Sequence, residues 1–404
     1  MKTSESGAAI AAVIAIALGA VLAGCGSSSS SSSSSSPTTA TAAAATNAAS
    51  TGASTGVSGP WDSYTTPLQG VCPSTIKVQT NWWPEPDHGG TYELIGPGGK
   101  IDASNNTYSG PLGKTGVTLQ ILAGGPATGF QQVSSQLYQN DSILLGYVGT
   151  DEAIQNSAKA PTVAVFATYD QNPQIFLWGN PKWNFTSVGQ IGKANAPVLA
   201  FNGATYLSLF EQEGLLNKKQ LDTSYNGSPA RFVLDNGNVV EQGFATNEPY
   251  EYEHEVPQWK KPVKFLLVRE YPVYQSALSI RADKLAANAA CLTKLIPLFQ
   301  QAEKDYINDP VPVNNELLKI VSTFKTSGFT LSAGGNAAAV QEMKSLHLVE
   351  NGPNNTLGAF SSSRVQELID KLAPVFKAQG IKLKAGLKPS DVATNQFLNP
   401  SIGL

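Results

Sequence analysis

Residues 75–92, TIKVQTNWWPEPDHGGTY, join an alternating run of apolar and polar residues to a dense group of aromatic and turn-forming residues. The alternation over 75–81 predicts a half-buried β-strand. Two tryptophans, a histidine and a tyrosine follow, separated by proline and glycine. Because an open α/β sheet binds ligands beyond the carboxyl ends of its strands, this segment predicts a binding site for a planar ring.

Strand-like and helix-like runs alternate around this segment, which is typical of an α/β fold with largely parallel sheets. Further strands are predicted at 117–123, 143–149, 163–169, 175–178, 198–201, 239–245 and 263–268. Helices between them are predicted at 130–139, 151–158 and 204–216. From residue 285 onward apolar residues recur at helical spacing, which predicts helices at about 292–306, 314–324, 336–346 and 364–379.

The order of these elements predicts two lobes, each a mixed sheet flanked by helices. The chain leaves a first set of strands near Phe166 and returns near Tyr271–Tyr274. We therefore expect residues 71–165 plus 273–404 to form lobe 1 and residues 166–272 to form lobe 2. Two crossings between lobes make a hinge, and a ligand cleft is expected between them.

The N-terminus carries the pattern of a lipoprotein export signal. An apolar run ends in Leu22-Ala23-Gly24-Cys25, so residues 1–24 are expected to be a signal peptide and Cys25 the lipidated residue. An uncleaved membrane helix is the alternative, although it would usually need about 20 apolar residues. Residues 25–70 include ten consecutive serines and are expected to be a disordered tether that holds an extracytoplasmic body near the membrane.

Two cysteines remain once Cys25 is assigned to the lipid. An oxidising extracytoplasmic location favours a disulfide between Cys72 and Cys291 over two buried thiols. Such a bond would join the start of the folded body to a helix in its C-terminal half.

Charge and motif content exclude several classes of protein. Lys and Arg number 27 against 30 Asp and Glu, and the arginines are scattered, so no basic face for nucleic acid is expected. No phosphate-binding glycine loop, dinucleotide-binding motif or serine-hydrolase motif is present. His254 lacks a second histidine four residues away, which excludes a zinc-protease helix. We expect no metal, no cofactor, no catalytic residue and a monomer.

The aromatic segment supplies the first candidate ligand-binding residues, namely Asn81, Trp82, Trp83, His88 and Tyr92. Flat rings can stack on a planar ligand, and the amide and imidazole can hydrogen-bond its edge. One of the two tryptophans is expected in the core, because neighbouring residues of a strand point to opposite faces. A single histidine can equally be structural.

One spacing in the segment is W-x-P-x-x-x-H-x-G-x-Y, filled by Trp82, Pro84, His88, Gly90 and Tyr92. It resembles the thiamine-pyrimidine-precursor-binding branch of ABC transporter substrate-binding proteins. That branch is grouped with nitrate, sulfonate and taurine binders in the type II periplasmic-binding-protein fold. The resemblance covers most of 76–281, including 202–205 and 242–250. It implies an extracytoplasmic receptor that captures a pyrimidine-like thiamine precursor and delivers it to permease and ATPase subunits.

Further candidate ligand contacts lie where strands end and helices begin. On lobe 1 they are Gly124, Gly125, Thr150 and Asp151. On lobe 2 they are Asn202, Gly203 and Thr205 at a helix start, where an ordinary cap is the alternative, together with Glu248. Tyr271 and Tyr274 flank the returning hinge strand, which places one ring toward the cleft.

Two features depart from the family pattern. Trp83 is an extra aromatic residue, and residues 94–116 form an insertion rich in Gly and Asn. They leave riboflavin, a sulfonate, taurine or nitrate open as ligands. A second hypothesis is a pyrimidine-synthesis enzyme of the same fold, although similar eukaryotic enzymes carry a cysteine-rich cluster that this chain lacks. A third is a cell-envelope binding module without a transporter.

Overall fold

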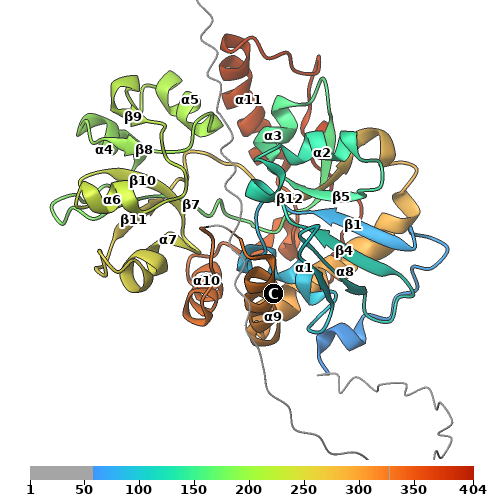
Figure 1. Ribbon diagram of the computed structural model, residues 1–404. Coiled ribbons are helices and arrows are strands. Elements are labelled where there is room, and N and C mark those ends of the chain that lie inside the picture. Colours follow the sequence, from blue (N-terminus) through green and yellow to red (C-terminus); the bar gives the residue numbers. More distant parts are fainter. Residues whose placement is uncertain (1–57, 327) are drawn as a thin grey trace, which may run out of the picture. The chain divides into compact units, whose positions relative to one another are not determined.

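The computed structural model describes residues 58–326 and 328–404, and these build two mixed β-sheets with flanking helices (Figure 1). The predicted signal peptide, Cys25 and the first part of the predicted tether lie outside the described residues. Within the described part of the chain, no helix combines the length and apolarity needed to cross a bilayer.

The larger sheet has seven strands in the order β2-β3-β4-β1-β5-β12-β6. Its strands are β1 (Thr75–Gln79), β2 (Lys100–Asp102), β3 (Thr107–Pro111), β4 (Thr118–Leu122), β5 (Leu145–Val148), β6 (Thr162–Phe166) and β12 (Ala277–Arg281). β1 pairs in parallel with β4 and β5, as expected from the alternation of strands and helices. β12, which the sequence analysis missed, runs antiparallel between β5 and β6.

The smaller sheet has five strands in the order β11-β7-β10-β8-β9. Its strands are β7 (Gln174–Trp178), β8 (Val198–Leu199), β9 (Leu221–Asp222), β10 (Val240–Phe244) and β11 (Lys264–Leu267). We call residues 58–166 with 277–404 the large lobe and residues 174–267 the small lobe. The mixed two-sheet α/β fold that the sequence predicts is therefore the fold of the protein.

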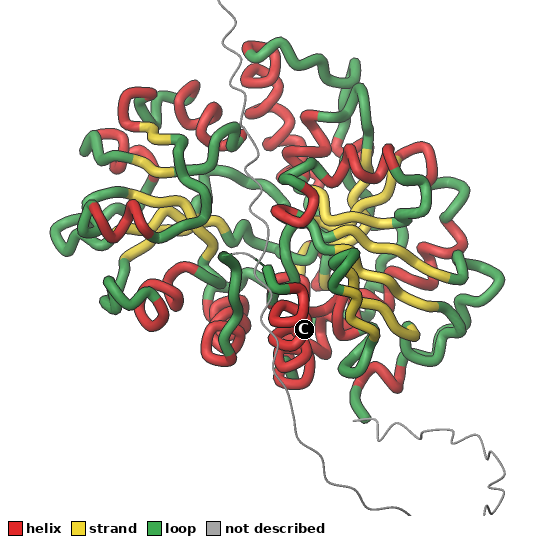
Figure 2. The backbone as a smooth tube through the Cα atoms, in the orientation of Figure 1, coloured by secondary structure: helices red, strands yellow, loops and turns green. Residues whose placement is uncertain are grey.

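Helices cover both sheets (Figure 2). Those up to the small lobe are α1 (Gly89–Glu93), α2 (Val133–Gln139), α3 (Thr150–Gln155), α4 (Val188–Lys193), α5 (Thr205–Gln212), α6 (Ala230–Leu234) and α7 (Glu248–Tyr250). The C-terminal block contains α8 (Ala289–Asn308), α9 (Val311–Phe324), α10 (Ala333–Ser345) and α11 (Ser362–Ala378), with a short pair of strands, β13 (Asn351–Gly352) and β14 (Thr356–Leu357). Serine side chains at 332 and 361 accept backbone N–H groups and so begin α10 and α11.

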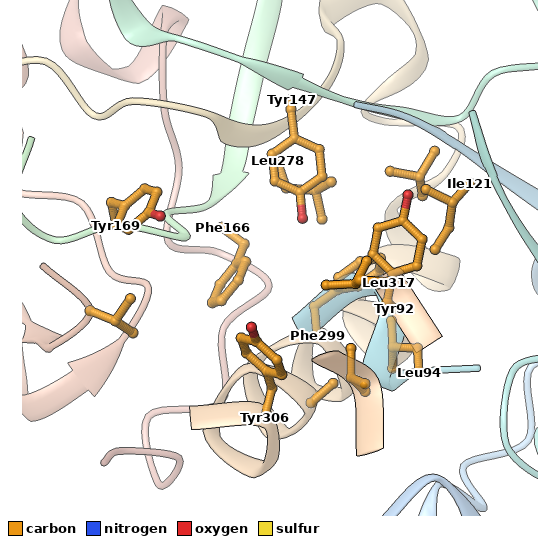
Figure 3. Close-up of a cluster of buried hydrophobic side chains, with 14 of the residues drawn as sticks. Tyr92, Leu94, Ile121, Tyr147, Phe166, Tyr169, Leu278, Phe299, Tyr306 and Leu317 are labelled. Atoms are coloured by element: carbon orange, nitrogen blue, oxygen red, sulfur yellow. The ribbon is translucent and has the colours of Figure 1, made fainter. Parts of the chain in front are cut away.

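The core of the large lobe lies between its sheet and α8. Tyr147 from β5, Phe166 from β6 and Leu278 from β12 cluster with Phe299 and Tyr306 of α8 (Figure 3). The apolar stripe of α8 that the sequence predicts is buried there. The helix stops before Asp309-Pro310, because a residue that precedes proline is disfavoured in the helical conformation.

Residues 58–70 belong to the folded body, which corrects the prediction that the tether reaches residue 70. Pro60–Ser63 forms a short 3₁₀ helix, and Trp61, Tyr64 and Leu68 are buried. The Tyr64 hydroxyl donates a hydrogen bond to Oδ2 of Asp305 on α8 at 2.9 Å. These large side chains bury enough apolar area to order a segment whose surrounding composition is that of a linker.

A disulfide joins the segment before β1 to the first turn of α8. The Sγ atoms of Cys72 and Cys291 lie 2.01 Å apart, and the Cα atoms are separated by 4.9 Å. The bond and the Tyr64–Asp305 hydrogen bond together attach the start of the folded body to the same helix.

The insertion at 94–116 extends the large sheet. It contributes the antiparallel hairpin β2–β3, and β3 pairs with β4 at the sheet edge. The Tyr108 hydroxyl donates to the carbonyl of Gly96 at 2.6 Å and accepts from the amide of Gly99 at 2.8 Å, which closes the loop that leads into the hairpin.

Two segments connect the sheets, 167–173 between β6 and β7 and 268–276 between β11 and β12. Arg364 on α11 binds both. Its guanidinium donates to the carbonyls of Pro272 at 2.9 Å, Val273 at 2.6 Å, and Asp170. It also lies 3.9 Å from the centroid of the Tyr274 ring. One side chain thus holds the two crossings together.

Replacing Arg364 with lysine is expected to destabilise the protein by about 2–4 kcal/mol, because a lysine ammonium cannot reach three carbonyls that a planar guanidinium satisfies. Urea unfolding at neutral pH measures the change. The control is Arg231→Lys. Arg231 on α6 forms an exposed ion pair with Asp235, so this substitution is expected to change the free energy of unfolding by less than about 0.5 kcal/mol. Equal unfolding midpoints for the two variants would contradict the role given to Arg364.

Glu93 on α1 has a buried carboxyl group whose two oxygens find no hydrogen-bond partner among the described residues. Burial, with added repulsion from Asp305 and Asp309, raises the pKa of Glu93 to about 8. The folded state therefore binds more protons than the unfolded state between about pH 4.5 and pH 8, and stability falls as pH rises through this range.

Glu93→Gln is expected to be more stable than the unchanged protein by about 1–4 kcal/mol near pH 9, because no charge is then buried. Near pH 5, where Glu93 is already neutral, the two proteins should unfold at similar urea concentrations. Glu211→Gln, on the exposed side of α5, removes the same charge without burial and serves as the control. A pH-independent difference would rule out the proposed ionisation.

Candidate functional site

A cavity of about 530 Å³ lies between the two lobes. The large lobe contributes the ends of β1 and β5, the start of α3 and the segment after β6, through residues such as Asn81, Tyr147, Asp151 and Tyr169. The small lobe contributes the segment after β8, the start of α5 and the region from β10 to α7, through residues such as Phe201, Thr205, Phe244 and Glu248. We call this space the interlobe cavity.

The structure places about half of the residues singled out in the sequence at this cavity. Those that line it are Asn81, Trp82, Asp151, Gly203, Thr205, Glu248 and Tyr271. Those that do not are Trp83, His88, Tyr92, Gly124, Gly125, Thr150, Asn202 and Tyr274. The first group comes from both lobes, so the structure brings together predicted residues that lie up to 190 positions apart in the chain.

The adjacent tryptophans separate as neighbouring residues are expected to do. Trp82 lines the cavity, whereas Trp83 is buried in the core of the large lobe. The Trp82 ring begins an aromatic series that reaches the small lobe. Its centroid is 5.8 Å from Phe130, which lies 6.4 Å from Phe201, and Phe201 lies 4.9 Å from Tyr225. Rings at these separations interact favourably, so the series connects the lobes at the cavity.

His88 is buried behind the cavity and acts on it through Asn81. Its Nε2 lies 2.9 Å from Oδ1 of Asn81, and because an amide oxygen only accepts, Nε2 carries the proton. Burial lowers the pKa of His88 to about 3, so the ring is neutral at physiological pH. The Asn81 amide nitrogen donates to Ser276 at 2.9 Å. His88 therefore orients a cavity residue and does not itself line the cavity.

The other predicted residues outside the cavity have structural surroundings. Tyr92 packs in the core with its centroid 5.8 Å from that of Tyr108. The Thr150 hydroxyl accepts the backbone N–H of Tyr274 at 3.0 Å. Tyr274 itself packs under Arg364, and Asn202 is exposed. Tyr92, Thr150 and Tyr274 thus make packing or hinge contacts, whereas the side chain of Asn202 is exposed outside the interlobe cavity.

Gly124 and Gly125 support Trp82 from behind. A Cβ atom on Gly124 would lie 1.9 Å from the carbonyl of Thr80. Gly125 has φ +56°, and a Cβ there would lie 2.5 Å from the Trp82 ring. These glycines therefore permit the close approach of the chain that seats the ring.

Seven carboxyl groups line the cavity, and only two of them, Asp151 and Glu248, are predicted from the sequence as ligand contacts. The seven are Glu85, Asp87, Asp151, Glu152, Glu248, Glu251 and Glu255. Several are held by hydrogen bonds. Tyr271 donates to Asp151 at 2.6 Å, Thr246 donates to Asp87 at 3.1 Å, and the amide of Phe244 donates to Glu248 at 2.6 Å. The Asp87–Thr246 bond runs directly from the large lobe to the small lobe.

Burial raises the pKa values of most of these groups. The pKa of Glu152 rises to about 7 and that of Glu248 to about 8, in both cases chiefly through loss of contact with water. The pKa values of Glu85, Asp87, Asp151 and Glu251 are raised as well, again mainly by burial. For Glu85, repulsion from Asp87 and Glu248 adds to the effect.

The remaining cavity residues that the sequence analysis missed had weak signals. Tyr147 and Phe201 lie at or just after predicted strands, where ligand contacts are expected, but each belongs to an apolar run typical of a core. Glu251 and Glu255 lie in the stretch 248–255, EPYEYEHE, where the sequence singles out only Glu248 as a ligand contact and His254 as lacking a metal-protease partner. Across the described residues, no cluster of three or more His, Cys, Asp or Glu side chains has the geometry to hold a metal ion.

Comparison with solved structures gives binding proteins of one architecture. The periplasmic aliphatic sulphonate binding protein SsuA from Escherichia coli matches with a TM-score of 0.50 and 16% identity, over 81% of this chain and 92% of that chain. The alkanesulfonate-binding protein SsuA from Xanthomonas axonopodis, bound to MOPS, matches with a TM-score of 0.48 and 15% identity, over 80% and 99%. The nitrate-binding protein NrtA from Synechocystis PCC 6803 has a TM-score of 0.40 and 12% identity, over 78% and 92%.

Scanning the sequence against protein-family models finds no match, and a search of the curated proteins finds none. The structural likeness to the Escherichia coli protein therefore shows the fold. The described part of this chain has the two-lobed α/β fold of the periplasmic binding proteins.

Proposed function

We propose that this protein is the extracytoplasmic receptor of an ABC importer and that it captures a small planar polar molecule in the interlobe cavity. The favoured ligand is a pyrimidine-like thiamine precursor, and the partners are permease and ATPase subunits. The export signal and Cys25 would anchor the receptor to the cell membrane through a lipid. The receptor role is supported by the fold, which this chain shares with a protein described as a periplasmic sulphonate binder.

The observation that carries the proposal is the composition of the cavity wall. Both lobes contribute rings and hydrogen-bonding groups to one shared space, with Trp82 and Asp151 on one side and Phe201 and Glu248 on the other. A ligand favours closure only through contacts that it gains in the closed state. A molecule that touches both walls gains such contacts, which is the requirement for a receptor that signals occupancy by closing.

The enzyme hypothesis receives less support. A pyrimidine-synthesis enzyme that uses its own histidine would need an imidazole in reach of the substrate. His88 instead lies behind Asn81, is 1% exposed and is neutral. The two cysteines of the described chain are bonded to each other, which leaves no free thiol among the described residues for a cysteine-rich centre.

Trp82→Ala is expected to reduce the increase in melting temperature that a saturating aminopyrimidine gives, because the variant loses a stacking surface of about 0.5–1.5 kcal/mol beyond burial and the end of the aromatic series. Thermal-shift measurements with a panel of pyrimidines, flavins, sulfonates and nitrate test this. Trp82→Phe keeps a ring and should retain part of the shift. An unchanged increase in melting temperature in Trp82→Ala would mean that the ligand binds elsewhere. Recovery of a chemically altered ligand would favour the hypothesis of a pyrimidine-synthesis enzyme.

A further inference from the structure

The interlobe cavity is lined by acidic side chains without basic ones. Seven carboxyl groups face it, and none of its described lining residues is Lys, Arg or His. None of the seven pairs with a lysine or arginine anywhere in the described chain. The nearest approach to a pair is His88 Nδ1 at 4.0 Å from Glu85, but burial lowers the pKa of that imidazole to about 3 and it carries no charge.

Carboxylates that are partly removed from water destabilise the folded state unless hydrogen bonds or a cation offset their charge. Here five of the seven accept a hydrogen bond, from Tyr271, Thr246, Ser332 and the amides of Phe244 and Ser134. Among the described residues, Glu85 and Glu251 accept none, and no cation faces any of the seven, so the charge is offset only in part. An anionic ligand would add like charge to the group, whereas a cation would neutralise it. The absence of any basic lining group among the described residues also leaves an anion without the partner that such ligands usually find.

The carboxyl groups come from both lobes, which connects ligand charge to closure. Glu85 precedes the 3₁₀ turn Pro86–His88 of the large lobe and Asp87 lies within it, and Glu248 begins α7 of the small lobe. Burial raises the pKa of Glu85, and the charges on Asp87 beside it and on Glu248 of the small lobe raise it further, so carboxyl groups of the two lobes repel each other. A cation placed among them would convert this repulsion into attraction for both lobes at once.

Aromatic rings in the cavity wall can also bind a cation. Trp82 and Phe201 face the cavity from opposite lobes, and a cation over such a ring is attracted by the negative π face. Tyr169, which is only 2% exposed, lies at the cavity wall with its hydroxyl beside Asp87, so an aromatic ring and a carboxyl group adjoin there as well.

An inorganic ion does not fit these observations. Within the described residues, no three carboxyl, imidazole or thiol groups converge closely enough to bind a metal ion. The carboxyl groups instead spread over a cavity of about 530 Å³, which is the size of a small organic ligand.

We propose that the interlobe cavity binds a small organic cation, a protonated amine or a quaternary nitrogen attached to a planar ring, with carboxylates of both lobes around the charge and Trp82 and Phe201 against the ring. This inference rests on the proposed function and specifies the chemical class of its ligand. A protonated aminopyrimidine belongs to the class, whereas sulfonate and nitrate do not.

Binding of such a cation is coupled to proton release. The titratable groups that line the cavity are Asp151 and Glu152 on α3, Glu85 and Asp87 near α1, Glu248, Glu251 and Glu255 around α7, and the hydroxyls of Tyr147, Tyr169, Tyr206, Tyr225 and Tyr271. In the free protein the pKa of Glu152 is raised to about 7 and that of Glu248 to about 8. A bound cation favours their ionised forms, so protons leave on binding and affinity rises between about pH 6 and pH 8.

Three probes with one ring and one linker carbon test the charge, namely benzylamine, benzyl alcohol and phenylmethanesulfonate. Each is added to the full protein at the same millimolar concentration, and calorimetry and thermal shift measure binding. Benzylamine is expected to bind about tenfold more tightly than benzyl alcohol, and the sulfonate should bind least. Benzylamine heats should also differ between buffers of different ionisation enthalpy, because protons are released.

Glu251→Gln is the main variant. The carboxylate of Glu251 lines the cavity and accepts no hydrogen bond among the described residues, so its replacement should leave the fold intact. This substitution should weaken the binding of benzylamine and leave the binding of benzyl alcohol unchanged. The control Glu211→Gln on α5 should change the binding of neither probe. Glu248→Gln gives a second, independent test. Equal binding of the three probes, or preference for the sulfonate, would overturn the cation inference and leave the receptor intact. Binding of none of them would count against the interlobe cavity as a ligand site and hence against the proposed function.

Discussion

The guanidinium of Arg364 binds the two crossings between the lobes, and the geometry of the interlobe cavity depends on it. Three backbone carbonyls from segments that are about a hundred residues apart accept its hydrogen bonds, and the Tyr274 ring lies beneath it. Because the fork of donors is planar and rigid, the two strands of the hinge keep one spacing while the sheets on either side can rotate. The two sheets position the cavity residues of the two lobes. The conformation of the hinge therefore determines which side chains of one lobe lie close to those of the other.

The wall of the cavity has an electrostatic imbalance that folding alone does not relieve. Carboxyl groups from both lobes share one space, and most of them retain protons to higher pH than exposed carboxyl groups do. Such an arrangement costs stability in the free protein, which is common at functional sites because the same groups gain when the correct ligand arrives. The fold is that of a protein described as a sulphonate binder, yet the charge of this cavity is opposite to what an anion requires. Fold and ligand class are therefore separate questions here.

The sequence predicted well the elements whose patterns are strong and local. β1, β4, β5 and α8 were predicted within a few residues of their observed ends, because alternation and apolar stripes are properties of short segments. β12 and the folded segment 58–70 were missed, since the first depends on pairing with distant strands and the second on three buried side chains in a linker-like composition. At the site, Trp82 and Asn81 lie where strand position implies, whereas the carboxyl excess appears only when three separate segments are brought together.

The hairpin formed by the insertion has a consequence for behaviour in a crowded solution. A sheet whose last strand is long and flat can recruit a strand from a neighbouring molecule. Here the outermost strand on one side is β2, three residues long and carrying Lys100 and Asp102. On the other side, β6 is covered by a bridge between Ala164 and Ala393 in the C-terminal segment. Both borders of the large sheet are thus closed to further strands, which protects the protein from edge-to-edge aggregation.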